Sequence, residues 1–212
     1  TVRNMPGASG YSVLKFRDKI DKGKILGPRI QTSGPAIAPS NGYFSVKRYF
    51  PSNPLLLFIL SRLYRVNGLS IDVDNIEEGR EAVKKLKRKG VDFIKTVTPG
   101  AYISFAEDDE ELKEDLLEKG LKLETIEASM KLEVLKAIVD EAHKQGLKVA
   151  VHTISKPEDF KKAVQAGVDS LEHIPLGIID DETFEIMKKN NIYWVPTVFP
   201  IFNWKNFIDN PE

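Results

Sequence analysis

Residues 146–175, GLKVAVHTISKPEDFKKAVQAGVDSLEHIP, decide the fold because they hold two apolar runs separated by a helical segment. Each run follows a glycine, Gly146 or Gly167, and each ends near a histidine, His152 or His173. The intervening segment carries a proline in its first turn and a glycine at its end, which predicts a helix. The stretch therefore predicts a strand, a helix and a second strand, with a histidine at the same point of both strand units.

The same unit recurs on both sides of this stretch. Helices are predicted over residues 75–90, 129–146, 156–167 and 180–191, and each is followed by an apolar strand. Four passes from helix to strand imply right-handed crossovers and a parallel sheet. The strands are nearly continuous apolar runs, as expected when helices cover the sheet. Residues 1–5, 12–23 and 28–34 further predict a strand, a helix and another strand.

We expect a single domain over residues 1–212 with two irregular insertions, at about 35–70 and 100–128. The first contains NPLLLFILSRLY (53–64), which predicts a short helix packed on the domain, with membrane or partner docking as the alternative. The second contains EDDEELKEDLLEKG (107–120), which predicts a pair of charged helices with a solvated face.

Composition excludes several classes of function. The 31 basic and 31 acidic residues balance, and no basic cluster with interleaved aromatics indicates a nucleic-acid surface. The longest apolar run, LLLFIL (55–60), is too short to cross a bilayer, so we expect no membrane span. The absence of cysteine excludes disulfides and thiolate metal sites and fits a reducing, cytoplasmic location. We also expect no signal peptide, since the first residues lack the pattern of one.

Three side chains that bind metals or protons fall near the carboxyl ends of the predicted strands. Lys95 lies five residues after Gly90, and His152 and His173 lie six residues after their glycines. This edge is where α/β barrels and open α/β sheets place their active sites. Neighbouring strand ends lie roughly 5 to 10 Å apart, so the two imidazoles could share or flank a metal ion. A lysine inside an apolar run needs a partner, loss of its charge or a modification.

Simpler roles compete with this interpretation. A histidine at a strand end can be a hydrogen-bonded polar residue without a ligand. His143 lies in the last turn of a polar helix and is expected to interact with that helix end. Glu172 should point to the face opposite His173, which predicts a structural role. Trp194 and Trp204 are expected to pack in the core or at its rim.

Six segments together resemble the amidohydrolase superfamily, and within it the imidazolonepropionase- and prolidase-like group. They are TVRNMPG (1–7), GPRIQTSGPAI (27–37), GVDFIKTVTPG (90–100), LKAIVDEAHKQGLKVAVHT (135–153), AVQAGVDSLEH (163–173) and DDETFEIMKKNNIYWVPT (180–197). The most specific part of the resemblance is residues 135–173.

The resemblance implies a (β/α)₈ TIM-barrel fold with one or two divalent metal ions, usually Zn²⁺, at the carboxyl rim. It implies that Lys95, on the fourth barrel strand, is carbamylated by carbon dioxide and bridges the metals. It also implies that His152 and His173, on the fifth and sixth strands, are metal ligands. The implied activity is hydrolysis of an amide or peptide-type C–N bond in a small molecule such as a dipeptide, a cyclic amide or an N-acyl compound.

The sequence also departs from the family pattern. The His-x-His pair of the first barrel strand and the catalytic aspartate of the eighth are absent, which predicts an incomplete barrel lacking its first and last strands. We therefore expect no catalytic base within this chain, no assignable substrate-binding residue, and a fragment of a full enzyme. A second chain or a homo-oligomer could complete the barrel. Two alternatives stay open: an inactive, barrel-derived binding or structural protein, and an unrelated α/β enzyme without metal.

Overall fold

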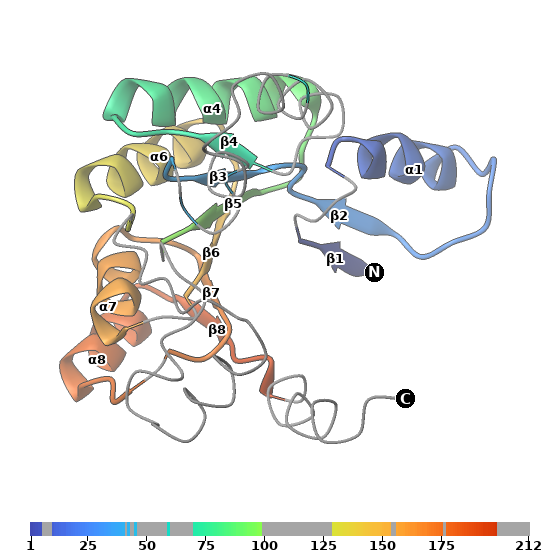
Figure 1. Ribbon diagram of the computed structural model, residues 1–212. Coiled ribbons are helices and arrows are strands. Elements are labelled where there is room, and N and C mark those ends of the chain that lie inside the picture. Colours follow the sequence, from blue (N-terminus) through green and yellow to red (C-terminus); the bar gives the residue numbers. More distant parts are fainter. Residues whose placement is uncertain are drawn as a thin grey trace, which may run out of the picture.

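The computed structural model describes residues 1–5, 10–40, 42, 45, 59, 70–98, 129–153, 156–175 and 177–198 (Figure 1). In chain order, the elements are β1 (Val2–Asn4), α1 (Ser12–Asp21), β2 (Ile30–Thr32), β3 (Ala36–Ala38), β4 (Ser70–Asp72), α4 (Ile76–Lys89), β5 (Ile94–Val97), α6 (Leu132–Lys144), β6 (Val149–His152), α7 (Pro157–Gln165), β7 (Ser170–Glu172), α8 (Asp181–Lys189) and β8 (Tyr193–Val195).

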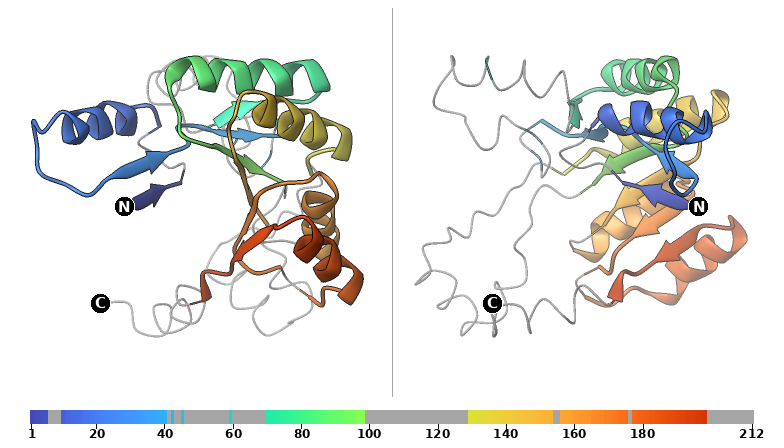
Figure 2. Two further views of the ribbon diagram at one scale, coloured as in Figure 1. Left: turned by 180° about the vertical axis from the view of Figure 1, so that it is seen from behind. Right: turned by 90° about the vertical axis from the view of Figure 1, so that its right-hand side faces the viewer.

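Six of the strands form one parallel sheet in the order β4-β3-β5-β6-β7-β8, and β1 pairs with β2 in a separate two-stranded parallel sheet. From β5 to β8 the strands follow one another in chain order, as short right-handed crossovers require. Helices α4, α6, α7 and α8 lie along one side of the curved sheet (Figures 1 and 2). The predicted α/β class is confirmed, and the arrangement is that of a partial α/β barrel.

Helices α4 and α8 begin at side-chain caps close to their predicted starts, whereas α6 begins at Leu132, three residues after its predicted start at residue 129. The Asn75 side chain accepts a hydrogen bond from the backbone N–H of Glu78 at the start of α4, and Gly90 ends that helix with a φ of 81°. Asp180 caps α8 in the same way by accepting from the backbone of Thr183. A left-handed residue after the last turn suits glycine because a Cβ atom would be strained there.

The expected insertion at 35–70 begins too early. Residues 36–38 form β3, which lies between β4 and β5 in the main sheet, and residue 70 begins β4. The proline and glycine that precede β3 suggested an irregular segment, but pairing on both sides of a three-residue strand outweighs that local signal. Most of residues 41–69, all of 100–128 and Trp204 lie outside the described residues, so their predicted helices and packing stay predictions.

The main core lies between the sheet and its helices. Ile94, Val149, Val151 and Leu171 of the strands pack with helical side chains such as Leu86, Leu135, Ile138 and Phe160, and all of them are at most 1 % exposed. Each fully buried side chain of this size contributes about 1.5 to 3 kcal/mol. The opposite face of the sheet carries a separate small cluster of Ala36, Ala38 and Val97. The functional side chains lie on that second face.

Among the described residues, no helix is long and apolar enough to cross a membrane.

Candidate functional site

The strand register places Lys95 and His152 on the same face of the sheet. Lys95 pairs with Ala150, and Val97 pairs with His152, two residues further along both strands. Because side chains alternate along a strand, Lys95, Val97, Ala150 and His152 all point to one side. Lys95 is the second residue of β5 and His152 the last of β6, so Lys95 lies one layer deeper than the glycine spacing predicted.

His173 joins this face by breaking the alternation of its strand. It follows β7 immediately, and its φ of 79° lies in the left-handed region, which costs a non-glycine residue about 1 to 3 kcal/mol. The turned backbone brings the His173 ring to the His152 ring, with centroids 4.5 Å apart in an edge-to-face arrangement. All three predicted residues are therefore brought to the carboxyl side of one sheet face.

The prediction that Glu172 points away from the site is wrong. Glu172 pairs in register with His152 and so shares its face. The positive φ of His173 lets the side chains of Glu172 and His173 point to the same face of the sheet, which the strict alternation of a strand forbids. The Glu172 side chain is only 4 % exposed, and its carboxylate acts electrostatically on both Lys95 and His173.

Arg3 of β1 holds the Glu172 carboxylate from across the fold. Its guanidinium lies 3.3 Å from Glu172 Oε1, and the Ser170 hydroxyl donates to the same oxygen at 2.8 Å. Arg3 also lies over the Phe93 ring, 4.9 Å from its centroid. Sequence reasoning missed Arg3, and its only signal was an arginine within an otherwise strand-like segment. Their separation of 169 positions in sequence gave no reason to pair Arg3 with Glu172.

Lys95 is buried without a hydrogen-bond partner for its amine among the described residues. Burial lowers the pKa of Lys95 to about 7; the Glu172 carboxylate opposes this shift and Arg3 adds to it. Ala150 lies beside Lys95 in the register, and the alanines of β3 lie on its other side. The lowered pKa makes the neutral, nucleophilic form of the Lys95 amine abundant near neutral pH.

Both histidines of the site are held as neutral imidazoles. Burial lowers the pKa of His152 well below its ordinary value, and Lys95 and His173 lower it further. Burial also lowers the pKa of His173, to about 4, with a further decrease from Lys95. Neutral imidazole is the form that binds metal ions.

The donor set fits a divalent cation in part. Two neutral imidazoles and an amine that lacks a partner converge, although no three His, Cys, Asp or Glu side chains of the described ranges are grouped closely enough to hold an ion. Lys95 is thus the third group, and as an amine it becomes a strong metal ligand only after modification. His143, in the last turn of α6, instead lies 2.8 Å from Asp169 at the opposite edge of the sheet.

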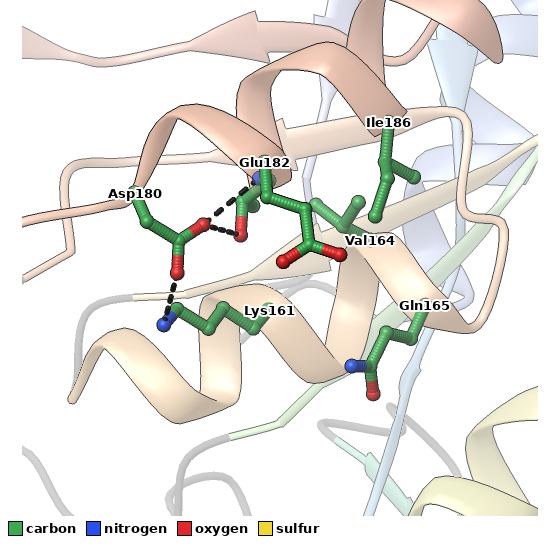
Figure 3. Close-up of a pocket in the computed structure, with 7 residues that line it drawn as sticks. Lys161, Val164, Gln165, Asp180, Glu182 and Ile186 are labelled. Carbon is green, nitrogen blue, oxygen red and sulfur yellow. Dashed lines mark hydrogen bonds and ion pairs between the residues drawn. The ribbon is translucent and has the colours of Figure 1, made fainter.

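A surface pocket of about 240 Å³ lies elsewhere, between α7 and the start of α8 (Figure 3). Its polar wall includes Lys161 and Asp180, which form an ion pair at 2.5 Å, and its apolar wall includes Val164 and Ile186. The pocket lies in the outer helical layer and contains none of the three predicted site residues, so it is separate from the site on the inner face.

Trp194 of β8 and Thr197, two residues after that strand, contact His173. The Trp194 indole N–H donates to the His173 carbonyl oxygen at 2.7 Å, and the Thr197 hydroxyl lies 2.7 Å from Nδ1 of His173. The Trp194 ring also packs edge-to-face on Phe160, as expected for a packing residue. Thr197 was not predicted, because its contact depends on the turn after β8.

Fold and site together define a partial α/β barrel with ligand-type side chains at its carboxyl edge. The model of the Amidohydrolase family matches residues 1–207, and the chain belongs to this family. Amidohydrolases generally use divalent metals.

Two relatives illustrate this membership. The chain is 29 % identical to ochratoxinase from Aspergillus niger over 193 residues, which cover 89 % of this chain and 36 % of that protein. The crystal structure of that ochratoxinase matches with a TM-score of 0.70 and 27 % identity, over 98 % of this chain and 44 % of the other. A Xaa-Pro dipeptidase structure with bound methionine matches with a TM-score of 0.67 and 29 % identity, over 99 % of this chain and 45 % of the other. The chain thus spans about a third of the curated relative that it matches.

Proposed function

We propose that this chain carries part of the metal centre of a hydrolase that cleaves an amide or peptide-type C–N bond in a small molecule. The observation that carries the proposal is that His152, His173 and the buried Lys95 lie on one sheet face, with no hydrogen-bond partner for the Lys95 amine among the described residues. Family membership supports hydrolysis, and the sheet edge is the one where α/β barrels perform chemistry. The similarity to ochratoxinase and to a Xaa-Pro dipeptidase supports an amide-type substrate. The proposed substrate class includes dipeptides, cyclic amides and N-acyl compounds.

His152 and His173 would bind the cation through neutral ring nitrogens, and zinc is the cation best suited to such donors. A cation held there supplies a Lewis acid that lowers the pKa of water and polarises a carbonyl group. Lys95 would join as a carbamate. Its neutral amine would form an N–C bond to carbon dioxide as one C–O π bond opens, and would release one proton, which would give a carboxylate in place of the amine.

The remaining residues position these ligands. Arg3 and Ser170 fix the Glu172 carboxylate, which lies within electrostatic range of both Lys95 and His173. Its negative charge offsets positive charge gathered at the site without taking a ligand position. The strand β8, at the edge of the sheet, is exposed, and we include in the proposal that a further strand, from this protein or a second chain, completes the barrel there. The absence of cysteine is consistent with a cytoplasmic location.

The test measures metal bound per chain by mass spectrometry after dialysis against metal-free buffer and reloading with zinc. We expect stoichiometric zinc in the wild-type chain and in His143→Gln, which is the matched control because His143 lies at the opposite sheet edge. We expect loss of zinc in His152→Gln and in His173→Gln. A folded wild-type chain without zinc would overturn the proposed metal centre and favour a barrel-derived binding protein.

The carbamate has its own readout. In buffer containing ¹³C-labelled bicarbonate, a carbamate on Lys95 gives a ¹³C NMR signal that is absent from Lys95→Met. Zinc should strengthen this signal, because the cation binds the carboxylate form. Identical spectra for the two proteins would refute the modification of Lys95. The role of the histidines as ligands would still be decided by the zinc measurement.

A further inference from the structure

Strand β8 and the turn after it hold His173 at its backbone N–H, its carbonyl oxygen and one ring nitrogen. Its backbone N–H donates to the Val195 carbonyl at 2.8 Å, and its carbonyl accepts from the Trp194 indole at 2.7 Å. The Thr197 hydroxyl lies 2.7 Å from ring nitrogen Nδ1. All three contacts come from residues 194–197, which we call the His173 clamp.

The clamp holds a backbone conformation that the sequence does not favour. His173 and Thr197 both have positive φ angles, 79° and 48°, and neither is glycine. Such conformations persist where the surrounding contacts determine them, and they concentrate at functional sites. Without the bond to Val195 and the indole cap, His173 would relax toward the extended conformation, and alternation would carry its ring to the helical side of the sheet.

We propose that Thr197 is a positioning residue that accepts a hydrogen bond from Nδ1–H of His173, fixes this tautomer and so directs Nε2 to bind the ligand. A hydroxyl can donate or accept, but only acceptance leaves the Nε2 lone pair for a metal ion. The described residues contribute no hydrogen bond to Nε2. Metal-binding histidines ordinarily hold their second nitrogen in this way. Trp194 has the companion role of fixing the backbone that carries the ring.

The role of Nε2 as ligand rests on the metal centre proposed above, but the tautomer does not, so the two can be tested separately. The chain has only three histidines, which makes ¹⁵N-histidine NMR of the metal-free protein simple to assign. His143→Gln and His173→Gln identify their signals, and the third belongs to His152. Long-range ¹⁵N–¹H spectra at about pH 8 then report which nitrogen of neutral His173 carries the proton.

We expect His173 in the Nδ1–H form in the wild type and in Thr197→Ser, which keeps the hydroxyl. In Thr197→Val we expect the Nε2–H form to appear, together with zinc affinity about 10- to 100-fold weaker. Thr183→Val is the matched control, because it removes a threonine hydroxyl that bonds Asp180 in the same unit, away from His173. It should leave tautomer and zinc affinity unchanged, and circular dichroism confirms that each variant is folded.

A wild-type His173 in the Nε2–H form would overturn the inference, since Thr197 would then be the donor. An unchanged tautomer in folded Thr197→Val would also overturn it. If the tautomer behaves as expected and the wild-type chain binds no zinc, the positioning role stands and the metal centre fails. Equal zinc affinity in Thr197→Val and Thr197→Ser, with a changed tautomer, would refute the link between tautomer and ligand nitrogen.

Discussion

The amino and carboxyl edges of the sheet, where its strands begin and end, carry the same types of side chain in different environments. At the amino edge, Lys148, His143 and Asp169 meet where β6 and β7 begin. At the carboxyl edge, Lys95 and His173 meet Glu172 where β7 ends. Both groups therefore contain a lysine, a histidine and a carboxylate, but among the described residues only the first group has a hydrogen-bond partner for each member.

At the amino edge, Asp169 accepts from Lys148 at 2.6 Å, from the Val149 backbone at 2.8 Å, and pairs with His143 at 2.8 Å. Burial acts to raise the pKa of Asp169, but these hydrogen bonds more than offset it and the pKa is lowered. The hydrogen bond to Asp169 raises the pKa of Lys148. The charged forms of Asp169 and Lys148 are both stabilised, so this group contributes to stability.

At the carboxyl edge, burial dominates instead and lowers the pKa values of Lys95 and His173. The Glu172 carboxylate is held by Arg3 and Ser170 and does not hydrogen-bond the Lys95 amine. The fold therefore keeps neutral bases at this edge at a cost in stability. Perturbed pKa values of this kind indicate functional sites. The amino edge therefore contributes to stability, whereas the carboxyl edge carries the candidate site.

The largest expected effect comes from removing the buried amine. A fall in the Lys95 pKa from 10.5 to about 7 corresponds to about 5 kcal/mol of lost stability at low pH. Because the unfolded chain binds the proton more tightly, wild-type stability should rise by about 1.4 kcal/mol per pH unit between pH 7 and 10.5. Lys95→Met should lack this rise and be more stable at pH 7. Urea unfolding of metal-free protein in carbon dioxide-free buffer measures the pH dependence of stability and the difference between the two proteins at pH 7.

Lys148→Met is the matched control for this experiment, since it removes a lysine at the opposite edge whose side chain is 80 % exposed. It should retain the rise in stability above pH 7. If Lys95→Met and the wild type gave parallel pH profiles, the contrast between the two edges would be lost.

An intermediate effect is expected from Asp169→Asn, which keeps the shape of the side chain and removes its charge. We expect a loss of about 1 to 3 kcal/mol in the free energy of unfolding at pH 7, from hydrogen bonds to charged groups. The folded pKa of Asp169 is lowered, so this contribution is present above the ordinary value of 3.8 and disappears as the pH falls through the folded pKa. Zinc content should stay unchanged. A loss of zinc without unfolding would mean that the two edges are coupled.

The smallest effect is expected from Lys148→Met at neutral pH. An exposed ion pair contributes about 0 to 1 kcal/mol and is screened by salt. Unfolding of the wild type and the variant should therefore differ slightly at low salt and converge at high salt. A difference above 2 kcal/mol that persists in high salt would show that the amino edge depends on Lys148 far more than its exposure implies.

The sequence by itself determined the repeating strand and helix units, because glycine stops and apolar periodicity act locally. It also determined that Lys95, His152 and His173 belong to successive strand units, since each lies five or six residues after the glycine that precedes its strand. It did not determine the faces of Glu172 and His173. Alternation predicted opposite faces, and only the left-handed turn at His173, held by Trp194 and Val195, brings both to one side.

Only the tertiary structure decided which distant groups meet at the site. Arg3 reaches Glu172 across the fold, and Thr197 reaches His173 through the turn after β8. No local signal specifies such contacts, because they depend on how the strands curve and on which side chains fill the space between them. The sequence thus placed the ligand-type residues on the correct strands, and packing decided their orientation and their charge.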